Sequence, residues 1–305
     1  METCKNAALY TLLLTCAAAL VLYPAESGEA ARQGLRLCLE TVLPSLFPFF
    51  VLSTLAVETG AAEGLGRLLE PLMRPLFHMS GAGAAALALG LVGGYPVGAR
   101  TAAELYRTGS VSGEEAEGLL AFCNNAGPGF LLGVCGSGVF GSARAGVYLY
   151  LVHVAAAVLT GVTLRCAAAP EREPETRLRR RGTGRKGLVS AFPGAVRDSF
   201  AAVWSVCGYV VLFAVLLRLL TLVLPPHPLL LGFVELTNGV LSLSPDREGF
   251  VLCAALLGWG GLSVHAQTLS VLEGSGLSAR KFFLGKLVQA AWSLPLALLA
   301  AQRLY

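Results

Sequence analysis

The chain has 305 residues, of which 55% are hydrophobic and only 14% charged, and its formal net charge is +4. A soluble domain carries roughly 25% charged and about 45–50% apolar residues, so a soluble chain this apolar would expose large hydrophobic patches and aggregate. The composition therefore excludes an ordinary soluble enzyme and predicts a protein that has the lipid bilayer as its solvent.

The first apolar segment covers residues 7–23 and follows Lys5. A helix needs about 20 residues to cross a hydrocarbon core about 30 Å thick. Lys5 and the small residues after Tyr23 also fit a signal peptide. We favour a retained helix, because the rest of the chain is apolar as well. Further long apolar segments, rich in Leu and Ala and without strand-like alternation, predict membrane helices. They cover residues 35–57, 147–164, 200–224 and 282–301.

A glycine-rich segment, residues 83–107, contains the string GLVGGYPVGAR from Gly90 to Arg100. Gly94 permits backbone conformations closed to other residues, and Pro96 restricts Tyr95 toward extended geometry. We expect one helix to end here and another to begin, with free amides that attract anions and with Arg100 one turn beyond. The alternative is a tight packing turn between helices.

The next segment, residues 118–140, contains CNNAGPGFLLG. Asn124 and Asn125 are amides inside an apolar run, where unpaired amides cost free energy. Gly127 and Pro128 follow and predict unwound backbone beside them. We expect a polar pocket here; the alternative is structural hydrogen bonding between helices.

Residues 165–197 form the longest polar stretch. A basic run can bind nucleic acid, but between two membrane segments it indicates a cytoplasmic loop, and we expect no nucleic-acid partner. The orientation of the other spans follows from this loop and from Lys5, which places the N-terminus in the cytoplasm. The basic residues of the loop are Arg172, Arg177, Arg179, Arg180, Arg181, Arg185 and Lys186.

The second half of the chain has a short broken segment at residues 229–243, which contains VELTNG. An acid inside a membrane is a functional candidate, so Glu235, Thr237 and Asn238 are candidate binding residues, with Glu235 able to take up a proton or hold a cation. In the alternative interpretation, Glu235 pairs with a structural arginine such as Arg218.

Residues 250–272 are interrupted by GWGGLSVHAQ, which supplies Ser263, His265 and Gln267 as further candidates. His265 titrates near neutral pH and could bind a carboxylate or relay a proton; a lone structural histidine is the alternative. Arg280, Lys281 and Lys286 then predict another cytoplasmic turn before the closing helix.

The two halves repeat one order: a long helix, two broken segments and a plain helix. The predicted topology runs the corresponding long helices in opposite directions, which is typical of inverted-repeat transporters whose paired breaks surround the binding site. We predict an all-α polytopic membrane protein with two inverted repeats that contain re-entrant or broken helices. The expected parts are an N-terminal helix (1–30), a first repeat (31–166), the basic loop (167–197) and a second repeat (198–305).

No enzyme motif competes with a transporter: GxSxG, HExxH and P-loop strings are missing from the sequence. Glu235 and His265 lack metal-ligand spacing. We therefore expect no catalytic residues, no metal and no cofactor.

Several strings, taken in order, resemble the sporulation integral membrane proteins of the YlbJ type, within the wider group that carries nucleoside-recognition, or Gate, domains. The resemblance covers about residues 35–302, and Gly94, Ala126 and Gly129 depart from its usual Ser, Ser and Leu. The strings are GGYPVGAR, AAELYRTGSVS, AEGLLAFCNNAGPGFLLG, ELTNG and GWGGLSVHAQTLSVL.

The resemblance implies two Gate-type repeats and a multi-pass protein of the outer forespore membrane that moves dipicolinic acid during endospore formation. Half-helix N-termini, Arg100 and His265 would meet the two carboxylates of this planar dianion, Asn124 or Asn125 its polar edge, and Tyr95 or Trp259 its ring. A nucleoside or other small-metabolite carrier and a non-transporting scaffold for spore maturation are the alternatives. The sequence leaves homo-oligomerisation open.

Overall fold

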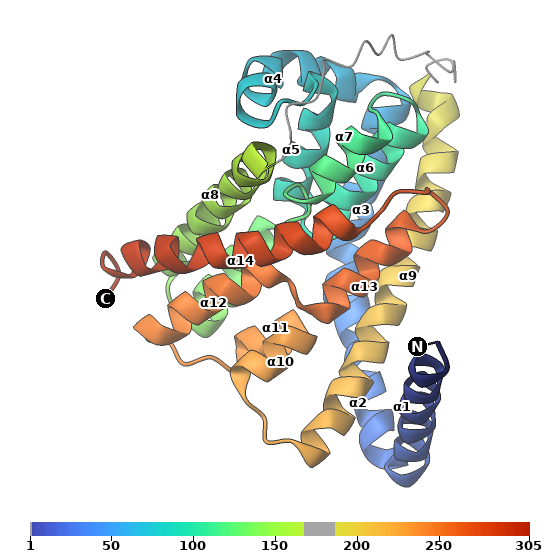
Figure 1. The fold of residues 1–305 in the computed structure, drawn as a ribbon, viewed down its shortest axis with the longest axis vertical. Helices are drawn as coiled ribbons and strands as arrows, with labels where there is room; N and C mark the ends of the chain where they lie inside the picture. The colour runs from blue at the N-terminus through green and yellow to red at the C-terminus, as the bar shows by residue number, and fades with distance from the viewer. Residues whose placement is uncertain (1, 168–186) are drawn as a thin grey trace.

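The structure is a computed structural model that describes residues 2–167 and 187–305. All regular elements in these two ranges are helices, and no strand occurs in them, so the all-α prediction is confirmed (Figure 1). In chain order the elements are α1 (Glu2–Leu22), α2 (Pro24–Leu37), η1 (Cys38–Val42), α3 (Leu43–Glu58), α4 (Ala61–Phe77), η2 (Gly81–Gly83), α5 (Ala84–Gly93), α6 (Val97–Arg107), α7 (Gly113–Leu120), η3 (Gly129–Val139), α8 (Ala143–Ala167), α9 (Leu188–Val223), α10 (Pro228–Val234), α11 (Leu236–Leu241), α12 (Arg247–Trp259), α13 (Gly261–Leu272) and α14 (Arg280–Ala301).

Two long helical rods, one from each half of the chain, lie side by side. The first is α2, the π-helical turn η1 and α3, with helical backbone at both junctions, and the second is α9. Gly34 packs on the backbone of Val211, and the rings of Phe47 and Phe200 lie 6.3 Å apart. Residue numbers therefore rise along one rod as they fall along the other. The rods run antiparallel, as predicted for this pair; the complete inverted repeat stays a prediction.

Four helices in the described ranges are long and apolar enough to cross a membrane, or five if a bent pair forms one span. They contain the predicted spans 147–164 and 282–301 and the predicted span 200–224 as far as Val223, and the fourth contains the broken segment 250–272. The bent pair is Glu70–Phe77 with Gly81–Gly93, which meet at 102°. The four helices are Ala143–Arg165, Leu188–Val223, Arg247–Leu272 and Arg280–Ala301.

The predicted spans at 7–23 and 35–57 are also largely helical. By length and composition, however, only the shorter apolar helices Leu13–Leu22 and Leu46–Glu58 are found in these regions. The first rod begins earlier than the predicted span 35–57, at Pro24, with a polar stretch that contains Glu26 and Glu29. Its helical length therefore exceeds its apolar length.

The glycine-rich segment 83–107 and the broken segment 229–243, which we expect to enter and leave the membrane on one side, each contain a helical hairpin. α5 and α6 pack along one another, with Gly90 against Gly98. α10 and α11 do the same, with Gly232 against Gly239. Glycine permits these close approaches because it has no Cβ. The placement of the hairpins within a bilayer stays a prediction.

α14 crosses the middle of the molecule between α8 and α12 (Figure 1). Its first turns enter one apolar cluster, where Phe282 lies near Phe122, and its last turns enter a second, where Ala297 lies near Phe250. The middle of α14 lies between the two apolar clusters, in the part of the molecule where the helix interruptions meet.

The basic residues of the predicted loop, from Arg172 to Lys186, lie outside the described residues. The end of that loop is helical, because α9 begins at Leu188. The domain boundary at residue 197 stays a prediction, although the change from the predicted loop to helix already occurs at Leu188. Arg197 is charged, but it lies on a helix whose preceding turns are mostly apolar.

Candidate functional site

The two helices of the first hairpin, α5 and α6, pack directly on the backbone of Cys123. A Cβ added to Gly90 or Gly98 would lie 1.9 or 2.0 Å from the carbonyl oxygen of Cys123. Such a distance is far below van der Waals contact, so only glycine fits at either position. The packing interpretation of these glycines therefore holds for the arms of the hairpin.

The tip of the same hairpin is the predicted helix break. Gly94 has a φ of +84°, in the left-handed region that favours glycine. α5 ends before it, and α6 begins after Tyr95 and Pro96. A Cβ added to Gly127 would lie 3.2 Å from the Cα of Gly94. The hairpin tip therefore contacts the second broken segment, which ends at Gly127 before Pro128 leads into η3.

The second broken segment is unwound over residues 121–127, and its two asparagines are fully buried. Asn124 donates from Nδ2 to Thr268 Oγ1 at 2.9 Å. Asn125 donates to the carbonyl of Phe122 at 2.8 Å and accepts from Gln289 Nε2 at 2.8 Å. The Oδ1 of Asn124 has no hydrogen-bond partner among the described residues. The amides thus bind neighbouring elements and retain one spare acceptor.

The second half is interrupted in a similar way. Gly260 and Gly261 have φ values of +89° and +79° and separate α12 from α13. A Cβ added to Gly261 would lie 2.9 Å from the backbone nitrogen of Leu236. This break therefore contacts the tip of the α10–α11 hairpin, as the break at Gly127 contacts the tip of the first hairpin.

Tyr95 connects the breaks of the two halves. Its hydroxyl donates to the carbonyl of Leu257 at 2.7 Å, and a Cβ added to Gly260 would lie 3.4 Å from the same oxygen. Four interruptions that the sequence suggested separately, around Gly94, Asn124, Glu235 and Gly260, therefore form one connected set of contacts in the interior.

Lys286 of α14 lies at this junction and is 0% exposed. Its Nζ donates to the Asn124 carbonyl at 2.5 Å and to Gln289 Oε1 at 2.7 Å, and it lies 5.1 Å from the centroid of the Tyr95 ring. We call Asn124, Asn125, Thr268, Lys286 and Gln289 the central polar cluster.

The prediction that Lys286 marks a cytoplasmic turn was wrong; of the three basic residues, only Arg280 and Lys281 lie at the exposed start of α14. The sequence contains a pattern that predicts a buried position for Lys286. Lys286, Gln289 and Ser293 recur at the spacing of one helix face, and all three are fully buried.

His153 of α8 is a second residue that the sequence reasoning missed. It is 1% exposed, and its Nε2 accepts from the amide of Ala126 at 3.0 Å. Its Nδ1 has no hydrogen-bond partner among the described residues. An ionisable side chain within the apolar segment 147–164 is the signal that could have found it.

The candidates on α13 divide between two environments. Gln267 donates to Ser263 Oγ at 3.2 Å, and both are buried. His265 has its Nε2 2.9 Å from the Trp259 carbonyl, and its ring packs 4.2 Å from Trp259 and 5.1 Å from Phe282. His265 therefore lies in an aromatic cluster and makes no hydrogen bond to the central polar cluster. Trp259 stacks on Phe233, with the ring centroids 5.1 Å apart.

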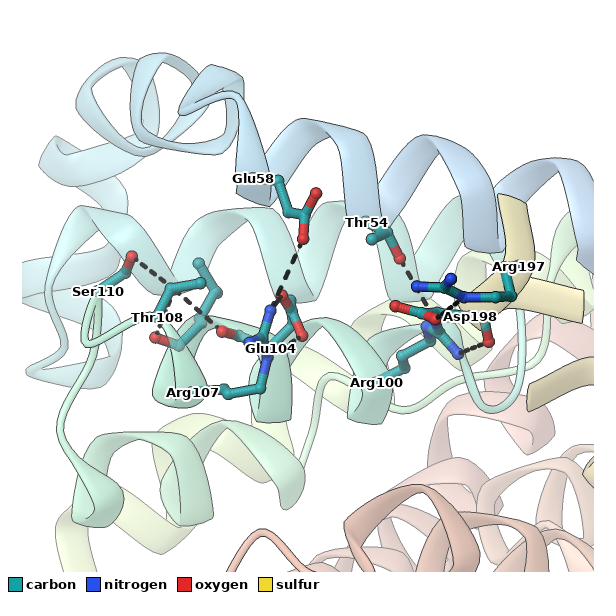
Figure 2. Close-up of polar contacts among 10 residues, drawn as sticks. Thr54, Glu58, Arg100, Glu104, Arg107, Thr108, Ser110, Arg197 and Asp198 are labelled. Atoms are coloured by element: carbon teal, nitrogen blue, oxygen red, sulfur yellow. Dashed lines mark hydrogen bonds and ion pairs between the residues drawn. The ribbon is translucent and has the colours of Figure 1, made fainter. Parts of the chain in front are cut away.

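Arg100 also lies apart from the central polar cluster, on the side of α6 that faces α3 and α9 (Figure 2). It donates to Thr54 Oγ1 at 3.3 Å and to the Asp198 carbonyl at 3.4 Å, and its guanidinium lies 4.9 Å from the Phe50 ring centroid. It lines a cleft of about 860 Å³ between α6, α9 and α13, which we call the α6 cleft. Further lining residues are Glu104, Arg107, Ser112, Ser205, Ser270 and Glu273.

Glu235 caps the first turn of α11. Its carboxylate accepts from the amides of Thr237 at 3.2 Å and Asn238 at 2.8 Å, and from Asn238 Nδ2 at 2.8 Å. No ion pair joins it to Arg218 within the described ranges, so the structural pairing considered for these two residues was wrong. Thr237 and Asn238 line a second cleft of about 890 Å³ together with Arg218.

Comparison with known proteins identifies relatives of the chain. A family model described as "Nucleoside recognition" (Gate) matches residues 39–169. The sporulation integral membrane protein YlbJ of Bacillus subtilis (strain 168) is 31% identical over 342 aligned positions, which cover 98% of this chain and 83% of the relative. No solved structure matches the chain.

The alignment with this relative covers nearly the whole chain, and the helical fold with its apolar spans is that of an integral membrane protein. The chain belongs to the family of the sporulation integral membrane protein YlbJ and carries a Gate domain.

Proposed function

We propose that this protein is a transporter that moves dipicolinic acid across the outer forespore membrane during endospore formation, with the N-terminus and the basic loop in the cytoplasm. The family supports a sporulation membrane protein of transporter type rather than an enzyme. The substrate, the membrane and the orientation are our proposal.

One observation carries the proposal: four helix interruptions meet around buried polar groups in the middle of a membrane protein. Irregular backbone at membrane depth is tolerated only where it is buried in protein or lines a wet cavity. Discontinuous helices of this kind form the substrate sites of secondary transporters.

The central polar cluster suits a small planar dicarboxylate. Lys286 supplies positive charge, and the ring of Tyr95 supplies a stacking surface. The side-chain amides of Asn124 and Asn125 would meet the substrate by exchanging their present hydrogen bonds to Thr268 and to the Phe122 carbonyl. Arg100 lies in the α6 cleft, so we assign it to the approach of the anion rather than to the buried site.

The test is uptake of radiolabelled dipicolinate into vesicles that contain the purified protein. We expect uptake above protein-free vesicles, and we expect Asn124→Ala to abolish it while the protein elutes normally on gel filtration. Arg100→Ala should slow uptake at low substrate concentration. Absence of uptake by the wild type would refute the proposal, and normal uptake by both variants would refute the assignment of the site.

A nucleoside carrier is the second candidate, because the matched family model is described by nucleoside recognition. Competition separates the two: excess uridine or adenosine should leave dipicolinate uptake unchanged if our proposal is correct. Inhibition by a nucleoside, with uptake of the labelled nucleoside itself, would favour the second candidate.

A scaffold that recruits spore-assembly proteins through the basic loop is a third candidate. Its binding residues would lie among residues 171–186, in the part of the chain that the structure does not describe. Deletion of 171–186 would abolish spore maturation if the protein were a scaffold, whereas a carrier should retain dipicolinate uptake after the deletion.

A further inference from the structure

Lys286 is the cation most completely removed from water in the described parts of the chain. It is 0% exposed, whereas the side chains of Arg107 and Lys281 are 61% and 45% exposed. An ammonium taken out of water is costly unless it is paired. An ionisable side chain buried inside a membrane protein is a candidate functional residue by default.

The partners of Lys286 are neutral. Its two acceptors are a backbone carbonyl and an amide oxygen, on Asn124 and Gln289, and no carboxylate of the described residues lies within 4.0 Å of its Nζ. By contrast, Arg107 and Lys281 face Glu104 and Glu114. The positive charge of Lys286 is therefore solvated by dipoles and is not cancelled by the protein.

Hydrogen-bonding capacity is also left over around this charge. An ammonium has three donors, and two of them are used. Beside it, His153 Nδ1 has no hydrogen-bond partner among the described residues, and because Nε2 accepts from the Ala126 amide, the neutral ring carries its proton on Nδ1 as a second spare donor. Asn124 Oδ1 is also unpartnered in the described ranges, but as an acceptor it suits a donor group of the substrate and not a carboxylate. These groups come from α8, α14 and the unwound segment, so the spare capacity converges from different elements on one place.

We propose that Lys286 is the fixed counter-charge that selects an anionic substrate and pairs with one of its carboxylates in the central polar cluster. This inference rests on the proposed transport function. It assigns selectivity for anions to one residue of α14, and it separates that residue from Arg100, whose charge lies in the α6 cleft.

The charge preference of the wild-type protein tests the inference without any substitution. Binding of dipicolinate is compared with binding of its neutral analogue pyridine-2,6-dicarboxamide, by isothermal titration of the purified protein. Gain or loss of one hydrogen bond to a charged group changes the binding affinity by about tenfold or more. We expect dipicolinate to bind at least about tenfold more tightly, and equal affinity would overturn the inference.

Lys286→Gln should reduce that preference by about tenfold or more, because the side chain keeps a donor and loses the charge. Lys281→Gln is the matched control: it makes the same substitution at an exposed position of the same helix and should keep the wild-type preference. Lys286→Arg should also keep a preference for the dianion. A structural role alone would lower the amount of folded protein but would leave the affinity ratio of the folded fraction unchanged.

If Lys286→Gln does not fold, the double variant Lys286→Met/Gln289→Leu removes the charge together with its side-chain acceptor, an exchange that buried pairs often tolerate. Transport of dipicolinate by a neutralised variant with wild-type charge preference would refute the role of Lys286 and leave the transport function intact. Failure of the wild type to bind or transport dipicolinate would refute the function itself.

Discussion

The central polar cluster and the α6 cleft both contain basic side chains, but their surroundings differ. In the cleft, Arg107 contacts Glu104 at 2.5 Å and Glu58 at 3.8 Å, and its side chain is 61% exposed (Figure 2). In the cluster, Lys286 is fully buried, and both of its acceptors are neutral. A cation already paired with carboxylates offers little net charge to a ligand. The comparison shows that the basic residue suited to hold an anion is the one that lacks a carboxylate.

The difference in burial between the central polar cluster and the α6 cleft also predicts how strongly substitutions in each will change stability. Groups in the centre are bonded to backbone and to one another across several helices, so their loss should propagate through the fold. In the cleft, the Arg107 side chain is 61% exposed and partly screened by solvent, so its loss should be mild. The predictions below run from the largest expected effect to the smallest.

Gly98→Ala should be the most damaging single change to the centre. The added methyl would overlap the Cys123 carbonyl oxygen, which lies 2.0 Å from its position. Overpacking of this kind costs about 1–3 kcal/mol or more. The measurement is thermal unfolding in detergent, with Gly208→Ala as the control, because nothing lies within 4 Å of its added Cβ. Equal stability of the two variants would contradict the hairpin packing.

Asn125→Leu should destabilise the protein by about 1–3 kcal/mol, because it leaves the Gln289 amide and the Phe122 carbonyl without their buried partner. The double variant Asn125→Leu/Gln289→Leu should cost less than the sum of the two single changes, because neither amide is then left alone. Strict additivity in unfolding experiments would show that the two side chains do not interact.

Tyr95→Phe should cost about 1 kcal/mol, because it removes one hydrogen bond to the Leu257 carbonyl and keeps the ring. Since this hydrogen bond joins the two halves, we expect a lower apparent Tm and faster hydrogen exchange at the end of α12. Tyr148→Phe on α8 is a comparison variant, because the Tyr148 hydroxyl makes no hydrogen bond to the described residues, and its ring contacts Arg144. If the two variants have the same Tm, the bond between the halves contributes nothing measurable.

Arg107→Gln should have the smallest effect, about 1 kcal/mol or less, because the Arg107 side chain is 61% exposed and its ion pairs with Glu104 and Glu58 are partly screened by solvent. Raised salt should reduce even this difference, since exposed charges are screened. A loss of stability as large as that of Asn125→Leu would show that the cleft and the centre are not distinct in the way described.

The sequence predicted the positions of the interruptions well, because glycine and proline act locally. Gly94 and Gly260 have left-handed φ values in the structure, and the helices α5 and α12 end directly before them, inside the two glycine strings. The contacts between the interruptions could not be predicted. That Tyr95 reaches Leu257, and that Gly261 packs on Leu236, depends on how segments distant in the sequence pack together.

The candidate site shows the same division. Asn124 and Asn125 were found because amides in an apolar run are unusual. Lys286 was assigned to a loop because it follows two other basic residues closely, although its helical spacing to Gln289 was available in the sequence. Arg100 and His265 were grouped with the asparagines by their chemistry alone, and the structure places them in other surroundings.

The hydrogen bond from Lys286 to the Asn124 carbonyl has a consequence for an empty carrier. An arriving carboxylate would take the third, unused donor of the ammonium, and on its departure the Asn124 carbonyl and the Gln289 amide would still hold the charge. The charge would therefore keep its acceptors throughout the proposed cycle, and it would avoid the several kcal/mol that a bare buried ion costs. If the proposed function holds, a chain that supplies its own acceptors would release the substrate and reset without first bringing in another ion.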